Sequence, residues 1–165
     1  MIRKLFFLVS FFLLYAVEAD AWKSFDKVAV KSVMKRVADW QIANPNKGAE
    51  HDDLDWTHAA LYMGMVDWAE LTEKEDADDS YFQWLLRIGK RNHFQVGKWM
   101  YHADFIAVGQ PFIDLYSKYG NKKMIAPVMA RANWVVENPA EVALALDYGK
   151  LETLDRWSWC DALFM

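Results

Sequence analysis

The stretch Thr57 to Leu71, THAALYMGMVDWAEL, indicates the fold class of the chain. Its apolar residues include Ala60, Met63 and Val66, which recur at a spacing that places them on one face of an α-helix. The acidic run Glu73 to Asp79 follows and is expected to form a solvated loop. The stretch therefore predicts an amphipathic helix that ends near Leu71.

Four further helices are expected on either side of this stretch. Their predicted ranges are Phe25 to Ala43 with Ser24 as N-cap and Asn44-Pro45 as stop, Asp79 or Ser80 to Lys90, Ala103 to Tyr119 before Gly120, and Lys122 to Val136 before Asn138-Pro139. No segment shows convincing strand-like alternation. The sequence thus predicts an all-α fold of stacked helical hairpins.

Composition excludes several classes of function. The chain has 165 residues, of which 54% are hydrophobic and 16% aromatic, so it can build a core and carries many flat aromatic faces. Its net charge is −4, and no Lys/Arg stripe runs among the aromatics, which excludes a typical nucleic-acid binder. Cys160 is the only cysteine, so neither an internal disulfide nor a cysteine-based metal cluster is expected.

The first 21 residues are expected to be a signal peptide. Arg3 and Lys4 precede the apolar run Leu5 to Val17, and Ala19-Asp20-Ala21 fits a cleavage site. The mature chain would begin at Trp22 and be secreted or periplasmic, meeting a membrane only through this segment. An uncleaved anchor is the alternative.

Asp104 lies among aromatic and apolar neighbours in Tyr101 to Gln110, YHADFIAVGQ. It is expected near the N-terminus of the predicted helix from Ala103, where the helix dipole favours an ionised carboxylate. His102 is expected to form a hydrogen bond at this helix start rather than to bind a metal. Taken alone, the position is that of an ordinary first-turn carboxylate, so a catalytic role needs further support.

Asp161 lies in Arg156 to Met165, RWSWCDALFM, between tryptophans and an apolar run. Burial there would disfavour the charged form and raise the pKa of the carboxyl group, as a general acid requires near neutral pH. A capping carboxylate beside core tryptophans fits the same residues. Both interpretations stay open on composition alone.

A second group of polar residues precedes the central helix. It comprises His51, Asp52, Asp53, Asp55 and His58. These residues lack the fixed spacing of a metal site and are expected to form a polar loop. No metal ligand is therefore predicted.

Several motifs together resemble a known family. They are MKRVADWQ at Met34 to Gln41, Asp55-Trp56-Thr57 with Tyr62-Met63-Gly64, His102-Ala103-Asp104 with Gly109-Gln110, and WCDALFM at Trp159 to Met165. In this order they resemble glycoside hydrolase family 105, the unsaturated rhamnogalacturonyl hydrolases, which are related to family 88. The resemblance extends from about Phe25 to Met165, and its last motif is the most specific.

The resemblance implies a fold and a set of site residues. The fold is a six-hairpin (α/α) barrel, of which residues 22–165 would form the N-terminal part, so the chain is expected to be truncated. Asp161 would be the general acid and base, and Asp104 its partner carboxylate. Tyr62, Trp157, Trp159 and His102 would contact the substrate, although packing in the hairpin core fits the aromatic residues equally well.

The resemblance also implies an activity that needs no cofactor. Such enzymes remove a 4,5-unsaturated uronyl residue from pectin-derived oligosaccharides by hydrating its vinyl ether double bond. The expected partner is accordingly an unsaturated uronyl oligosaccharide. The alternatives are a non-catalytic helical carbohydrate-binding protein and an inactive fragment of the enzyme.

Overall fold

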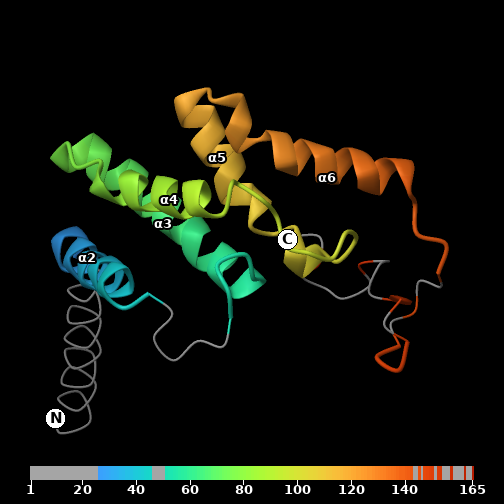
Figure 1. The fold of residues 1–165 in the computed structure, drawn as a ribbon. Coiled ribbons are helices and arrows are strands. Elements are labelled where there is room, and N and C mark those ends of the chain that lie inside the picture. Colours follow the sequence, from blue (N-terminus) through green and yellow to red (C-terminus); the bar gives the residue numbers. More distant parts are fainter. Residues whose placement is uncertain are drawn as a thin grey trace, which may run out of the picture. The chain divides into compact units, whose positions relative to one another are not determined.

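The computed structural model describes residues 26–45, 51–142, 145, 147–150, 152–153, 157, 162 and 165. The chain divides into two units, Met1–Pro45 and Asn46–Met165, which are treated separately below. Every regular element within the described residues is helical (Figure 1). This confirms the predicted all-α class.

In the first unit, helix α2 spans Lys27–Ala43. Its N-cap is Asp26, not the predicted Ser24, because the Asp26 carboxylate accepts a hydrogen bond from the backbone N–H of Ala29 at 3.0 Å. The predicted stop is confirmed: the side chain of Asn44 donates to the carbonyl of Trp40 at 2.9 Å, and Pro45 follows.

The second unit begins with an antiparallel hairpin of α3, Trp56–Asp76, and α4, Ser80–Arg91 (Figure 1). The two helices pack against each other through buried residues spaced three or four apart. These residues include Tyr62, Val66 and Ala69 on α3 and Tyr81, Leu85 and Ile88 on α4.

The predicted end of α3 at Leu71 is wrong, because the helix continues through most of the acidic run. Glu73 forms an ion pair with Lys118, which neutralises part of the charge. The helix ends where Ala77 adopts a left-handed conformation with φ of 54° and its N–H bonds the carbonyl of Thr72. The helix therefore ends at a local C-cap five residues beyond the predicted end.

Each of the next two predicted helices is instead a short 3₁₀ turn followed by a separate α-helix. A three-residue 3₁₀ turn, η1 at Ala103–Phe105, precedes α5 at Gly109–Tyr119, and a second, η2 at Lys122–Met124, precedes α6 at Ala126–Glu137. Pro111 and Pro127 lie in the first turns of α5 and α6, where a residue without an N–H leaves no hydrogen bond unmade. A continuous helix would place both prolines in its interior, so a new helix begins just before each of them.

The ends of α5 and α6 follow the prediction. Gly120 closes α5 with φ of 67°, a conformation that glycine adopts without strain. Asn138 donates from its side chain to the carbonyl of Trp134 at 2.8 Å before Pro139, the arrangement that also ends α2. The motif Trp-x-x-x-Asn-Pro therefore stops both helices.

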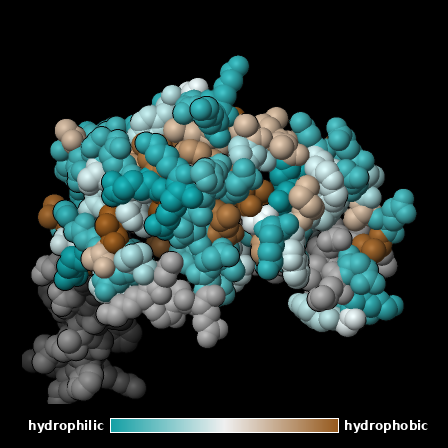
Figure 2. All heavy atoms as spheres, viewed as in Figure 1, coloured by the Kyte–Doolittle hydropathy of each residue, from teal (hydrophilic) through white to brown (hydrophobic). Residues whose placement is uncertain are grey.

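The core of the second unit lies where α3 meets α4 and α5. Its largest enclosed side chains are Tyr62, Tyr81, Phe82 and Phe112. On the face drawn in Figure 2, hydrophilic residues predominate and hydrophobic residues lie in separate groups. The packing of α5 on α3 brings the segment around η1 to the N-terminal half of α3.

Candidate active site

Asp104 lies in the turn η1 rather than at the start of an α-helix, which corrects the predicted setting. The backbone N–H of Asp104 donates to Nδ1 of His102 at 3.3 Å. The same ring nitrogen lies 3.8 Å from Oδ1 of Asp104. The Asp104 side chain is 28% exposed, whereas that of His102 is 9% exposed. The turn therefore presents the carboxylate at the surface and buries the imidazole behind it.

Aromatic packing holds the turn η1 in place. The ring of Phe105 stacks on Trp99 with centroids 5.1 Å apart, and both rings meet His102 edge to face. The N–H of Gly97 donates to the carbonyl of Phe105 at 2.6 Å. The residues on either side of Asp104 are thus tied to the loop that precedes them.

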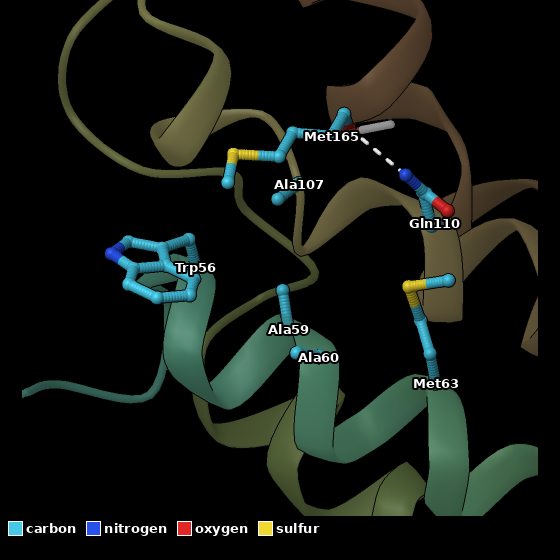
Figure 3. A pocket seen from close by; sticks show the side chains of 7 residues that line it. All are labelled: Trp56, Ala59, Ala60, Met63, Ala107, Gln110 and Met165. Atoms are coloured by element: carbon cyan, nitrogen blue, oxygen red, sulfur yellow. Dashed lines mark hydrogen bonds between the residues drawn. The ribbon is translucent and has the colours of Figure 1, made fainter. Parts of the chain in front are cut away.

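A pocket of about 150 Å³ lies between α3 and the start of α5 (Figure 3). Its walls are Trp56, Ala59, Ala60 and Met63 from α3, Ala107 and Gln110 from around the start of α5, and Met165. The side chain of Gln110 donates to the carbonyl of Met165 at 3.0 Å, as the dashed line in Figure 3 shows. The volume is below the usual range for a complete ligand site, so the pocket can enclose only part of a sugar.

Trp56 gives this pocket its aromatic wall. Its side chain is 42% exposed at the first residue of α3, and it offers a flat apolar face of the kind on which sugar rings stack. Asp55 caps the helix by accepting from the backbone N–H of Thr57 at 3.2 Å. The start of α3 therefore decides where the indole lies.

The loop before α3 is held by the carboxylate of Asp53. Arg91, at the end of α4, donates to both of its oxygens at 2.6 Å, and Asn92 donates to one at 2.8 Å. Burial raises the pKa of Asp53, but these hydrogen bonds and the charge of Arg91 outweigh it and hold the pKa below 3.8. Asp53 thus clamps the loop that leads into Asp55 and Trp56.

A family model described as Glycosyl Hydrolase Family 88 matches residues 33–165. The chain belongs to glycosyl hydrolase family 88. The fold of this family is an α/α barrel, of which the helical hairpins described above form a part. Both carboxylates of interest, Asp104 and Asp161, fall within the matched region. Membership of family 105 stays a prediction.

Two curated relatives of this family 88 chain carry the name unsaturated 3S-rhamnoglycuronyl hydrolase. One, from Alteromonas sp. (strain LOR), is 26% identical over 172 residues, which cover 91% of this chain and 40% of the relative. The other, from Formosa agariphila, is 25% identical over 149 residues, covering 88% of this chain and 37% of the relative. The chain thus spans about two fifths of the length of these relatives. No solved structure matches it.

The structure links the two motifs of the family 88 chain that contain the predicted carboxylates. Asp161 and Trp159 lie outside the described residues. Trp157, four positions before Asp161, donates from its indole to the carbonyl of Tyr101 at 2.6 Å. The rings of Trp157 and Tyr101 lie 5.8 Å apart. A described residue close to Asp161 in sequence therefore contacts the segment that leads to Asp104.

Tyr62 lies in the core rather than at a cleft wall. Its side chain is 2% exposed, its ring meets Trp84 edge to face at 5.7 Å, and its hydroxyl donates to Asp53 at 3.4 Å. Burial raises the pKa of the Tyr62 phenol. These contacts favour the core-packing interpretation of Tyr62 over the predicted sugar contact.

The sequence reasoning missed Trp56 and Gln110 as site residues, although both lie in motifs that carry the family resemblance. It also missed Asp53 as a structural anchor, because its partner Arg91 lies 38 residues away. The motif Asp55-Trp56-Thr57, already part of the family resemblance, was the available sequence signal for Trp56.

Two features are absent from the described part of the chain. No group of three or more His, Cys, Asp or Glu side chains there could hold a metal ion. No described helix combines the length and apolar character that crossing a membrane requires.

Proposed function

We propose that this chain belongs to a hydrolase that removes a 4,5-unsaturated uronyl residue from the end of an oligosaccharide. The observation that carries the proposal is the family 88 match over residues 33–165, which includes both carboxylate motifs. The names of the two relatives support an unsaturated uronyl substrate in general terms.

The proposed chemistry is hydration of a vinyl ether. Protonation at C4 of the unsaturated sugar creates an oxocarbenium-like cation at C5, and water adds there. The resulting hemiketal opens with release of the neighbouring sugar. Asp161 donates the proton and then activates the water, while Asp104 holds the geometry and shares charge. Asp161 must be protonated at the start, which an apolar environment favours.

Two contacts support a shared site for these carboxylates. Trp157 bonds to Tyr101, and Met165 accepts from Gln110 and lines the pocket. Asp161 is four residues from each of Trp157 and Met165 in sequence, and four extended residues span at most about 14 Å. Trp56 provides an aromatic wall beside the start of α5.

The test is turnover of an unsaturated uronyl disaccharide by the purified chain, followed as the loss of ultraviolet absorbance from the double bond. Asp161→Asn and Asp104→Asn should each lower kcat by about 10² to 10⁴. Asp39→Asn is the matched control, because Asp39 forms an exposed ion pair with Lys35 at 2.7 Å on α2 and should keep the rate within about twofold.

The outcomes separate the alternatives. Comparing an unsaturated rhamnogalacturonyl disaccharide with an unsaturated rhamnoglycuronyl substrate tests the finer specificity. Near-normal turnover by both site variants would reject the catalytic assignment. Disaccharide binding without any turnover would favour the two alternatives, a non-catalytic carbohydrate-binding protein or an inactive fragment of the enzyme.

Export through the first 21 residues is a separate proposal, supported only by the sequence of that segment. Protein recovered outside the cytoplasm should begin at Trp22 on N-terminal sequencing. Recovery with Met1 intact in a membrane fraction would contradict cleavage and support the anchor.

A further inference from the structure

Arg131 on α6 is a buried cation that binds neutral partners. Its side chain donates from Nη1 to the carbonyl of Trp99 at 2.8 Å and from Nη2 to the carbonyl of Gly97 at 2.7 Å. The residue is only 8% exposed, and no ion pair to it is found among the described residues. Buried arginines are usually paired with a carboxylate. A buried arginine bound to two carbonyls is therefore unusual and suggests a specific structural role.

The two carbonyls belong to a loop with very little freedom. A side chain at Gly97 would place its Cβ 2.7 Å from Cβ and 2.9 Å from Cα of Phe105, which is too close for either to stay in place. The Gly97 N–H bonds the Phe105 carbonyl, and the Trp99 ring stacks on the Phe105 ring. The loop is therefore held by Arg131 through its carbonyls and holds η1 through Gly97 and Trp99.

We infer that Arg131 is a positioning residue for Asp104, acting through the loop Gly97–Trp99 and the turn η1. The inference rests on the proposed role of Asp104 in hydrolysis. Phe105 is adjacent to Asp104 in the chain, so a shift of the loop moves the carboxylate with it. Arg131 itself does not touch the substrate in this account.

The guanidinium suits this task better than an ammonium group. Its planar fork reaches two carbonyls at once, whereas one lysine nitrogen approaches from a single point. It also stays charged over the whole working pH range, so the loop keeps its donor. Displacement of a catalytic group by about 1 Å costs on the order of 10² in rate.

The first measurement is steady-state kinetics of Arg131→Lys on the unsaturated uronyl disaccharide. We expect kcat to fall about 10- to 100-fold while KM changes less than about threefold, because binding surfaces remain and the carboxylate is displaced. Arg87→Lys, on the exposed face of α4, is the matched control and should leave kcat unchanged. Two results would overturn the inference. One is a rise in KM as large as the fall in kcat, and the other is a wild-type kcat in Arg131→Lys.

The second measurement does not depend on activity. Hydrogen exchange of the Gly97 amide should accelerate at least about tenfold in Arg131→Lys, while amides in the middle of α3 and α4 exchange as in the wild type. Equal acceleration everywhere would show a global loss of stability and reject a positioning role. If the purified chain shows no turnover, this exchange comparison alone decides whether Arg131 holds the turn. Equal exchange of the Gly97 amide in wild type and Arg131→Lys would then overturn the inference.

Gly97→Ala provides a second approach to the same contact if Arg131→Lys does not fold. It leaves Arg131 intact but forces Gly97 and Phe105 apart. The same fall in kcat at an unchanged KM is expected. Normal kcat in folded Gly97→Ala would show that the position of η1 does not matter for the reaction and would overturn the inference.

Discussion

Arg91 and Arg131 each anchor a loop to a helix, but Arg91 binds a charged carboxylate whereas Arg131 binds neutral backbone carbonyls. Arg91 is about half exposed, with 53% of its side chain accessible, and donates to both oxygens of Asp53. Arg131 is 8% exposed and donates to two backbone carbonyls. The first anchor sets the start of α3 with Trp56, and the second sets the turn that carries Asp104. The two sides of the candidate site thus depend on different contacts, one an ion pair at the surface and the other a buried cation bound to carbonyls.

The difference concerns what each anchor loses when it is broken. Removing Asp53 leaves a guanidinium that water can solvate, because Arg91 lies at the surface. Removing Arg131 leaves the carbonyls of Gly97 and Trp99 without the donor that they bind. A buried acceptor without a partner costs more than an exposed ion pair contributes. We therefore expect breaking the contacts of Arg131 with the two carbonyls to destabilise the fold more than breaking the Arg91–Asp53 ion pair.

The largest effect on stability is expected for Arg131→Met. The Gly97 carbonyl is buried, so losing its donor costs about 1 to 3 kcal/mol, whereas water can reach the part-buried Trp99 carbonyl. Relief of the buried charge offsets part of this cost. We expect a net loss of about 2 kcal/mol in the free energy of unfolding, measured by urea titration of the full chain. Arg87→Met is the control. A variant as stable as the wild type would show that the loop does not need the cation.

Asp53→Asn should be milder. Asn keeps the shape but loses the charge-assisted bonds from Arg91, and solvent at the exposed guanidinium reduces the loss to about 1 kcal/mol. The same urea titration measures it. A loss larger than that of Arg131→Met would reverse the proposed ranking of the two anchors.

Low pH should weaken the stabilisation from the Arg91–Asp53 ion pair but not that from Arg131. The pKa of Asp53 is lower in the folded than in the unfolded chain, so its stabilisation is complete above 3.8 and disappears as the pH falls through the folded pKa, below 3.8. The difference in unfolding free energy between wild type and Asp53→Asn should therefore shrink below pH 3.8. The difference between wild type and Arg131→Met should persist there. Equal pH dependence of both differences would contradict this distinction.

The smallest effect is expected at a glycine that takes no part in either anchor. A Cβ at Gly64, on the exposed side of α3, would meet nothing within 4 Å. Gly64→Ala should stabilise the helix by about 0.5 to 1 kcal/mol, because alanine loses less backbone entropy on folding. Thermal unfolding checks this and provides a baseline for the crowded Gly97→Ala. Destabilisation by Gly64→Ala would mean that the glycine has a packing role.

Local sequence signals predicted the elements and several of their ends. Gly120 and Asn138 terminate helices through contacts within one turn, so their effect is visible in a short window of sequence. Pro111 and Pro127 were equally local signals for a helix restart, and the continuous helices expected there were wrong. The end of α3 at Asp76 was missed because the acidic run was taken for a loop, and the pairing of Glu73 with Lys118, 45 residues away, was not visible in a local window.

The sequence alone determined the helical class, because helical periodicity depends on neighbours three and four residues apart. Its motifs also indicated the family 88 group, to which the chain belongs. Only the tertiary structure decided that Trp56, Gln110 and Met165 line one pocket and that Arg131 reaches the carbonyl of Gly97. These contacts join residues tens of positions apart in the chain. Their geometry depends on how α3, α5 and α6 pack, and packing arises from side-chain shape and burial over the whole unit, which no single stretch of sequence contains.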